Sequence, residues 1–423
     1  MQIVRYDVVV IGGGPAGLAA LNKVSDNSSY RIALIERDDY LGGILKQCIH
    51  DGFGLVKYQK LMAGPEYACK EIGLLNEKRN ITYYMKTFVY LIRSIGDEYV
   101  IDCTNRSGGY RLLAKKVIFA TGCRERTSKQ ILIPGTNPSG VMTAGKAQNY
   151  VNKLGYLPGK NFVILGSGDI GLIMARRLTL EGGNVLGVYE VRKTPSGLRR
   201  NIEQCLNDFN IPLYLSHTVS RVFGKKKLEK IELSKVDENL KIIPGSEKTF
   251  EVDTLLLSVG LVPYTQLLTN IGIPTSPSKG VMVNDHLETP VDGIFAAGNV
   301  LHVHDLVDNV VDEARLAGYS AAKYLKGELA RHETITCKAG NGIGYVVPNE
   351  LDLSNLEEVT PFKFRVRKPI KNVNVVISSG KEIKRIFKPV LIPSEMEVLN
   401  ISKDLLVGLS EPLTISLIEK EDK

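Results

Sequence analysis

The chain has 423 residues, too many for a single hydrophobic core, and this length predicts two or three domains. Its net charge is +8, and the basic residues are scattered through an ordinary globular composition, which argues against a nucleic-acid-binding protein. No segment is long and apolar enough to span a bilayer, and the six cysteines form no C-x-x-C pair that would indicate a zinc knuckle or an iron–sulfur cluster. We therefore expect a reduced, cytoplasmic protein.

The first 50 residues predict a strand, a helix and a second strand. The apolar run 8–11 leads into a G-x-G-x-x-G fingerprint made of Gly12, Gly14 and Gly17, with Pro15 and Ala16 between the last two. In this motif the first glycine allows a tight turn, the second lets the backbone approach a pyrophosphate, and the third lets helix and strand pack closely. Glu36 ends the second apolar run, where an acid accepts hydrogen bonds from a ribose. The segment therefore predicts a dinucleotide site.

A second copy of the fingerprint follows in the middle of the chain. Strand-like segments between 81 and 119 end in the small residues 120–122, and a later apolar run, 162–165, leads into the new copy. It comprises Gly166, Gly168 and Gly171, with Asp169 and Ile170 between the last two. Its acid is Glu190, and each acid lies 24 residues after the first glycine of its own fingerprint (12 to 36, 166 to 190). One such motif is a weak signal, but two in the same register predict a chain that holds two dinucleotides.

The remaining elements complete an α/β fold with two Rossmann-like dinucleotide-binding domains. A third apolar strand ends at Gly298-Asn299, and a helix is expected from about 309 to 325. From residue 362 apolar and polar residues alternate, which predicts a small antiparallel β domain. We expect the first dinucleotide domain at 1–155 and 285–335, the second, inserted domain at 156–284, and a linker with the β domain at 336–423.

These motifs together resemble the two-dinucleotide-binding flavoprotein family, which includes glutathione and thioredoxin reductases, over about residues 5–325. In that family the first unit holds FAD and the inserted unit holds NAD(P)H. The resemblance implies FAD contacts from the first fingerprint, Glu36, Arg37, Gly43, Gln47, Thr121, Gly122, Arg124, Gly298, Asn299 and Val310. It implies NAD contacts from the second fingerprint, Glu190 and Arg192.

Two details of the implied FAD site concern its late motif. The family has Gly-Asp where this chain has Gly298-Asn299, and an amide can still donate and accept a hydrogen bond at a ribityl hydroxyl. By the resemblance, the helix turn near Val310 points N–H groups at the flavin, where negative charge develops on reduction and a helix N-terminus stabilises it.

Within the family, the segments 120–126, 133–135 and 140–145 look like those of the flavin subunits of opine oxidase, hydrogen cyanide synthase and sarcosine oxidase. The chain also looks like small flavoproteins associated with glycerol-3-phosphate dehydrogenase-like partners. The resemblance implies an FAD-dependent, NAD(H)-dependent oxidoreductase that exchanges electrons with a partner dehydrogenase or oxidase subunit or with a small acceptor. The sequence leaves open whether the chain forms a homo-oligomer.

The choice of nicotinamide depends on Glu190. An acid at this position bonds the 2′-hydroxyl of NAD and repels the 2′-phosphate of NADP, so we expect NAD(H) over NADP(H). Basic residues downstream could oppose this preference: Arg192, Lys193, Arg199 and Arg200.

The thiol chemistry of the family leaves two alternative functions. Cys48 has no partner cysteine nearby and the chain has no histidine beyond His332, so dithiol–disulfide exchange is disfavoured. A lone Cys48 would suit a single-cysteine NADH oxidase or peroxidase or a coenzyme A disulfide reductase, although a packing role is commoner for such a thiol. The other alternative is a non-enzymatic flavoprotein that responds to nucleotides, against which the intact second fingerprint argues.

Two histidines follow the late glycine motif. His302 and His304 are expected near the isoalloxazine edge, where a role in hydrogen bonding, proton transfer or partner contact is open. No metal is expected, because no further ligand is close to this pair in the sequence.

Overall fold

The structure is a computed structural model that describes residues 3–330 and 332–419. The chain forms two compact units. The first combines the chain up to Lys46, Asp51–Cys123 and the chain from Pro263 onward, and the second combines Gln47–His50 with Arg124–Val262. The chain passes from one unit to the other after Lys46, His50, Cys123 and Val262, and the last two of these points lie in the short strands β7 (Cys123–Glu125) and β16 (Leu261–Pro263).

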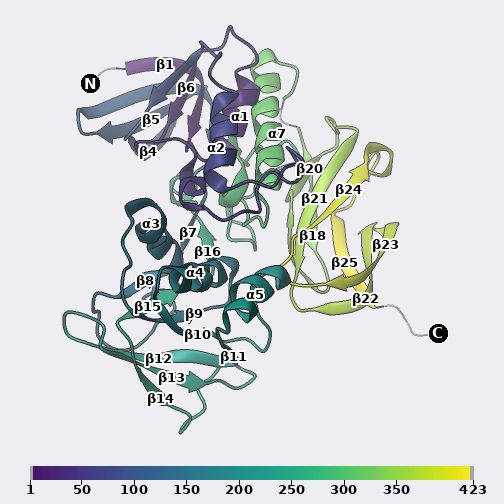
Figure 1. Cartoon of the computed structure of the whole chain (residues 1–423). Helices are drawn as coiled ribbons and strands as arrows, with labels where there is room; N and C mark the ends of the chain where they lie inside the picture. The colour runs from purple at the N-terminus through teal and green to yellow at the C-terminus, as the bar shows by residue number, and fades with distance from the viewer. Residues whose placement is uncertain (1–2, 331, 420–423) are drawn as a thin grey trace. The chain divides into compact units, whose positions relative to one another are not determined.

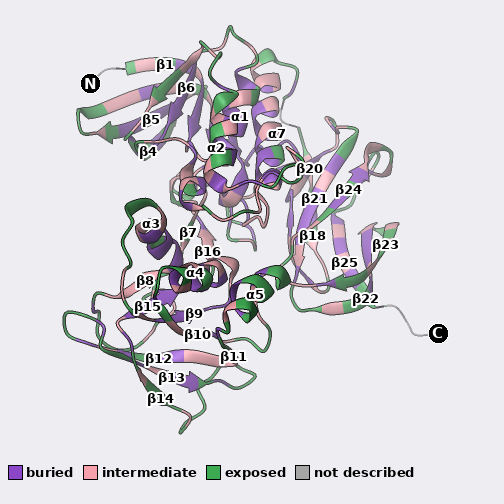
Figure 2. Cartoon of the chain, in the orientation of Figure 1, coloured by how far each residue is buried: buried purple, intermediate pink, exposed green. Residues whose placement is uncertain are grey.

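The first unit is built on a mixed sheet (Figure 1). Its strands lie in the order β3 (Ile81–Tyr84), β2 (Ile32–Ile35), β1 (Ile3–Ile11), β6 (Gly108–Phe119), β5 (Glu98–Asn105) and β4 (Phe88–Ile95), and β17 (Ile294–Ala296) also pairs with β6. The strands β1, β2, β3, β6 and β17 are parallel where they pair. Residues 8–11 of β1 and 117–119 of β6 are buried, as expected for parallel strands covered on both faces, whereas earlier residues of both strands are partly exposed (Figure 2).

The helices of this unit are α1 (Pro15–Val24), α2 (Gly64–Gly73), the short α6 (Gln266–Thr269) and α7 (Val307–Lys326). Helices α1 and α7 lie side by side, and their contact depends on Gly318, where a Cβ atom would overlap the carbonyl group of Ala20 (Figure 1).

The strand register gathers the predicted motifs at one edge of the sheet. Ile11 is paired with Ile35 and with Phe119, and Phe119 is paired with Ala296. The turns that follow these strands therefore emerge together at the carboxyl ends of parallel strands, where open α/β sheets bind ligands.

The second unit has a parallel sheet in the order β11 (Leu213–Leu215), β10 (Asn184–Glu190), β9 (Asn161–Leu165), β15 (Thr254–Leu257) and β8 (Val141–Thr143). Its helices are α3 (Ala144–Leu154), α4 (Asp169–Leu180) and α5 (Arg199–Cys205). An antiparallel sheet of β12 (His217–Phe223), β13 (Lys230–Lys235) and β14 (Lys248–Glu251) accompanies it.

The limits of this unit differ from the expected range of 156–284. Strand β8 pairs with β15, and Ala144, Ala147 and Val151 of α3 join the hydrophobic core of the second unit, so this unit begins near residue 124. In contrast, Leu268 and Val281 belong to the core of the first unit, so segment 263–284 is packed there. Both differences come from long-range packing that local sequence patterns do not report.

The C-terminal part of the first unit has a hydrophobic core of its own. One sheet has the order β20 (Glu350–Asp352), β18 (Thr334–Ala339), β25 (Leu413–Glu419), β22 (Ile370–Ser379), β23 (Lys381–Leu391), and the other has the order β19 (Ile343–Val347), β21 (Val359–Val366), β24 (Glu397–Ser402). The segment expected as a linker therefore contains most of β18 and all of β19 and β20. Strand β18 pairs with β25 in parallel, whereas the other strand pairs described in this β domain are antiparallel.

Among the helices of residues 3–330 and 332–419, none combines the length and the apolar character needed to cross a membrane.

Candidate nucleotide sites

The first fingerprint forms a tight turn between β1 and α1. Gly12 has a φ of +107°, and a Cβ atom on Gly17 would overlap the carbonyl oxygen of Gly12, so both positions require glycine for the fold itself. Gly14 differs, because its φ is −75° and a Cβ atom there would meet nothing within 4 Å. Gly14 is the N-cap of α1 and has no side chain to cap the helix, so the first-turn N–H groups are left for an anion. This geometry fits a pyrophosphate.

Glu36 ends β2 and is bound to the glycine turn. Its Oε2 accepts a hydrogen bond from the Gly13 N–H at 2.6 Å, and its Oε1 accepts one from the Asp38 N–H at 2.8 Å. Each carboxylate oxygen keeps a further lone pair for a ribose hydroxyl. Arg37 is exposed, and Gly43 lies against Gly14, since a Cβ atom on Gly43 would be 3.0 Å from the Gly14 Cα.

The turns after β6 and β17 meet this fingerprint. Gly298 has a φ of +78°, and a Cβ atom there would lie 2.8 Å from the Ala16 Cβ and 3.3 Å from Val310 in the first turn of α7. The Thr121 hydroxyl donates to the Tyr264 carbonyl at 3.0 Å, and the Tyr264 N–H donates to Gly122 O at 2.9 Å. These contacts bring the predicted FAD residues of the first unit to a single place.

Two predicted FAD residues lie in the second unit instead. Gln47 is buried, and its amide donates to Gly145 O at 2.9 Å and to Gln148 Oε1 at 3.0 Å, so both amide hydrogens anchor α3. Arg124 is exposed on β7. Cys48, adjacent to Gln47, is half-buried, and burial raises the pKa of its thiol to about 12.

The second fingerprint repeats the geometry of the first. Gly166 has a φ of +95°, and a Cβ atom on Gly171 would lie 2.6 Å from the Ser258 Cβ. Gly168 is the N-cap of α4 with a φ of −67°, and the nearest atom to a Cβ there would be the Ser258 hydroxyl oxygen at 3.2 Å. As in the first fingerprint, a Cβ atom at the second glycine would meet less of the protein than one at the first or third glycine.

Glu190 binds the second glycine turn through several donors. Its Oε2 accepts from the Ser167 N–H at 3.0 Å, the Ser167 hydroxyl at 2.6 Å and the Ser196 hydroxyl at 3.1 Å, and its Oε1 accepts from the Arg192 N–H at 3.1 Å. The Arg192 side chain is exposed. The Glu190 side chain is thus held at the turn.

Asp169 and Ile170 have structural contacts in this unit. Asp169 Oδ1 accepts hydrogen bonds from the Leu198 N–H at 2.8 Å and from the Asn201 amide at 2.6 Å, so this carboxylate holds the start of α5. Ile170 packs against the hydrophobic core of the second unit.

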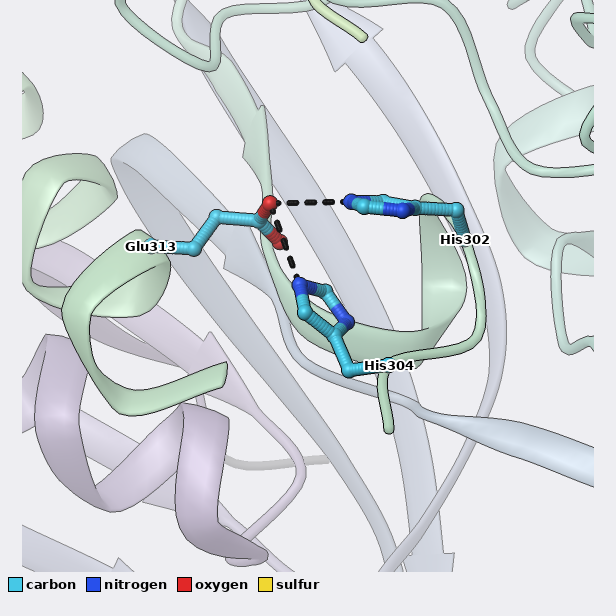
Figure 3. A group of neighbouring side chains, drawn as sticks. All are labelled: His302, His304 and Glu313. Atoms are coloured by element: carbon cyan, nitrogen blue, oxygen red, sulfur yellow. Dashed lines mark hydrogen bonds and ion pairs between the residues drawn. The ribbon is translucent and has the colours of Figure 1, made fainter. Parts of the chain in front are cut away.

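A buried polar cluster lies behind the Gly298-Asn299 turn (Figure 3). His302 Nε2 and His304 Nε2 lie 3.1 and 3.3 Å from Oε2 of Glu313, and Glu313 Oε1 accepts a hydrogen bond from the Gly298 N–H at 2.8 Å. His304 Nε2 is close enough for an ion pair but is not aligned for a hydrogen bond. The backbone N–H of His304 donates to Asn299 Oδ1 at 3.0 Å, and the Asn299 amide donates to Cys123 Sγ at 3.6 Å.

Glu313 adds a carboxylate to the two histidine rings, and the sequence had not predicted an acid beside them. The two rings and the Glu313 carboxylate have the composition of a metal site, with ligand atoms within 4.8 Å of one another. However, Lys363 Nζ donates to the same Glu313 Oε2 at 2.6 Å, so an ammonium group already occupies the cation position. The sequence does contain one indication that Glu313 is buried, because this acid lies beside the apolar stripe of α7 that Val310 and Ala314 form.

Burial and neighbouring charges shift the pKa values of His302 and Glu313 in this cluster. Burial, with a contribution from His304, lowers the pKa of His302 to about 4, so its ring is neutral at pH 7. Burial alone would raise the pKa of Glu313, but Lys363, His304 and His302 outweigh it and hold that pKa well below its usual value. Glu313 is therefore a buried carboxylate that depends on the positive charge of Lys363.

Comparison with known proteins agrees with this geometry. A protein named as the small chain of glutamate synthase from Mycobacterium tuberculosis is 25% identical over 78% of this chain and 69% of its own length. An NAD(P)H sulfur oxidoreductase of Pyrococcus abyssi is 23% identical over 72% of this chain and 64% of its own length. The crystal structure of T. acidophilum thioredoxin reductase shares the fold, with a TM-score of 0.61 and 22% identity over 76% of this chain and 98% of that one.

The family model for pyridine nucleotide-disulphide oxidoreductases matches residues 6–314, well over half of the chain. The match includes both fingerprints, their acids and the Gly298-Asn299 turn, and it ends before the C-terminal β domain. The chain therefore belongs to the pyridine nucleotide-disulphide oxidoreductase family and is an FAD-dependent oxidoreductase that uses a pyridine nucleotide.

Proposed function

We propose that this chain takes hydride from NADH onto FAD and passes the electrons to a partner dehydrogenase or oxidase subunit or to a small acceptor. The observation that carries the proposal is the pair of matching glycine turns. In each, a glycine with negative φ caps a helix without a Cβ atom, and a glutamate is bound to the adjacent N–H group. When bound, the flavin supplies the hydride-accepting ring and the nicotinamide supplies the hydride.

The residues of the first unit would hold FAD in a defined way. The first turn of α1 would bind the pyrophosphate, Glu36 the ribose, and the Gly298-Asn299 turn the ribityl chain. The first turn of α7, which contains Val310, would place positive helix-dipole charge beside the flavin.

A partner subunit is supported by one relative and by the cysteines. The M. tuberculosis relative is named as the small chain of glutamate synthase, and a small chain is one subunit of an assembly. The sequence places no second cysteine beside Cys48, so we propose no dithiol relay at the flavin. The closer kinship to the flavin subunits of opine oxidase, hydrogen cyanide synthase and sarcosine oxidase stays a prediction.

Stopped-flow mixing with NADH tests this function. We expect the purified protein to carry FAD, the flavin absorbance to bleach within one catalytic cycle, and an artificial acceptor to sustain turnover. Affinity purification from the native host then identifies the partner, which we expect to be a dehydrogenase or oxidase subunit. A protein that holds no FAD, or whose flavin neither nicotinamide reduces, would refute the proposal.

Glu190 is expected to set the preference for NADH. We predict that Glu190→Gln lowers the ratio of kcat/KM for NADH to that for NADPH by about tenfold, because it removes the charge that repels a 2′-phosphate while keeping an oxygen acceptor. The ratio is measured with an artificial acceptor, and Glu203→Gln on the exposed face of α5 is the control. A wild type that prefers NADPH would contradict this and would assign Arg192, Arg199 and Arg200 to the 2′-phosphate.

A single-cysteine reductase remains the second candidate, since one relative is named as a sulfur oxidoreductase. The thiolate is the reactive form of cysteine, and burial raises the pKa of Cys48 to about 12, which disfavours the thiolate at neutral pH. We therefore predict that Cys48→Ser changes NADH consumption with peroxide or with coenzyme A disulfide by less than about twofold. Loss of that activity in Cys48→Ser, with FAD content unchanged, would establish the thiol mechanism instead.

A further inference from the structure

The strand β21 presents different residues on its two faces. Phe362 and Phe364 are fully buried in the core of the C-terminal β domain. Lys363 and Arg365 alternate with them and therefore point to the opposite face. Lys363 is nevertheless 8% exposed, which is unusual for a lysine and indicates a specific partner.

The partners of this second face lie beside the Gly298-Asn299 turn. Lys363 Nζ donates to Glu313 Oε2 at 2.6 Å, and Glu313 Oε1 accepts from the Gly298 N–H at 2.8 Å. Two hydrogen bonds therefore connect the C-terminal β domain to the backbone of the late glycine motif.

The loop between Asn299 and α7 is held from the same side. Arg365 donates to Val303 O at 3.0 Å and forms an ion pair with Asp305, whose other carboxylate oxygen accepts from the Met396 N–H at 2.7 Å. His302 Nδ1 lies 3.4 Å from the Tyr345 hydroxyl on β19. The β domain thus contacts, through hydrogen bonds and an ion pair, the segment that contains His302 and His304.

We propose that Lys363 and Glu313 are positioning residues for the flavin, so that the C-terminal β domain completes the FAD site of its own chain. The proposal rests on the proposed function, because it takes Gly298-Asn299 as a flavin contact. It assigns to the β domain a role at the site.

Charge explains why the pair acts as a unit. Glu313 is fully surrounded by protein, and removal of one partner of a buried ion pair leaves an uncompensated charge that the site must neutralise or expel. Without Lys363, Glu313 would become protonated or would depend on His302 and His304 for a balancing positive charge. His304 Nδ1 also lies 3.3 Å from Asn299 Oδ1, so a disturbance at Glu313 reaches the predicted flavin contacts through Gly298 and through Asn299.

Three variants of the full chain test the proposal by their FAD dissociation constants. We expect Lys363→Met to weaken FAD binding at least tenfold. We expect Glu313→Gln alone to weaken it as well, because the Lys363 ammonium then loses its carboxylate. In Lys363→Met/Glu313→Gln no charge is left unpaired and the introduced amide oxygen can still accept from the Gly298 N–H, so we expect affinity within threefold of the wild type. Lys371→Met, at an exposed position on β22, is the control and should bind FAD normally.

A second measurement separates positioning from general stability. The absorption spectrum and midpoint potential of the bound flavin should shift in Lys363→Met and return in the double variant. If Lys363→Met lowers only the thermal stability and leaves affinity, spectrum and potential unchanged, the proposal is overturned. If Lys363→Met does not fold, Glu313→Gln decides: unchanged affinity and potential there overturn the proposal. A wild type that binds no FAD refutes the proposed function instead.

Discussion

Replacement of Gly14 by alanine is expected to weaken FAD binding strongly while the protein itself remains folded. The φ of Gly14 suits any residue, and a Cβ atom there would meet no protein atom within 4 Å. The methyl group would, however, stand at the helix N-terminus where the pyrophosphate is expected. We predict a loss of affinity of at least about a hundredfold, or about 3 kcal/mol, measured by flavin fluorescence titration and accompanied by an unchanged far-UV circular dichroism spectrum.

Two further variants make the interpretation specific. In Gly17→Ala the added atom would overlap the Gly12 carbonyl oxygen, so this variant should lose roughly 4 kcal/mol or more of unfolding free energy whether or not FAD is present. In Gly168→Ala, the corresponding change in the second fingerprint, FAD should stay bound while NADH no longer reduces it. A Gly14→Ala protein that binds FAD like the wild type would refute the assignment of the first fingerprint.

The second large predicted effect is a loss of folding stability at acidic pH. Because burial lowers the pKa of His302 from 6.5 to about 4, the unfolded chain takes up this proton at a higher pH than the folded protein. The contribution of His302 to stability is therefore fully present above pH 6.5 and is lost as the pH falls towards 4. The loss amounts to about 3 kcal/mol, at 1.36 kcal/mol for each pH unit between the two pKa values.

Denaturation with urea at pH 7.0 and pH 4.5, followed by circular dichroism, measures this effect. We expect His302→Gln to lose less stability between the two pH values than the wild type does, whereas His332→Gln, at an exposed position, should follow the wild type. Burial raises the pKa of Asp285 to about 6, and this opposing contribution is present in every variant, so it cancels in the difference between variants. Parallel curves for the wild type and His302→Gln would contradict the prediction.

Local motifs predicted the two strand–turn–helix segments with their glycine turns, because the residues of such a turn lie close together in the sequence. Gly17 meets the Gly12 carbonyl and Glu36 accepts from the Gly13 N–H within one β-α-β segment, and the spacing of these residues carries that information. The family match and the fold confirm the two Rossmann-like domains that this spacing indicated.

The features that sequence patterns missed depend on distant parts of the chain. Glu313 is nine residues from His304, and Lys363 is a further fifty residues away on a strand of another core, so nothing local links them. Gln47 has the right sequence position for the resemblance, yet α3 takes up its amide hydrogens. Strand β8 joins the second unit through β15, more than a hundred residues later.

Strand β21 has core residues of the β domain on one face and Lys363 and Arg365 on the other, and this arrangement limits where the chain can be truncated. The match to the family model ends at residue 314, and a truncated version that stops before β18 would look like a minimal catalytic module. Such a fragment would retain Glu313 without the ammonium group that balances it, and the loop with Asp305 would lose Arg365. A stable excised module would therefore need Glu313 replaced at the same time, and a graft of the β domain onto a shorter relative would need an acid supplied at the corresponding helix position.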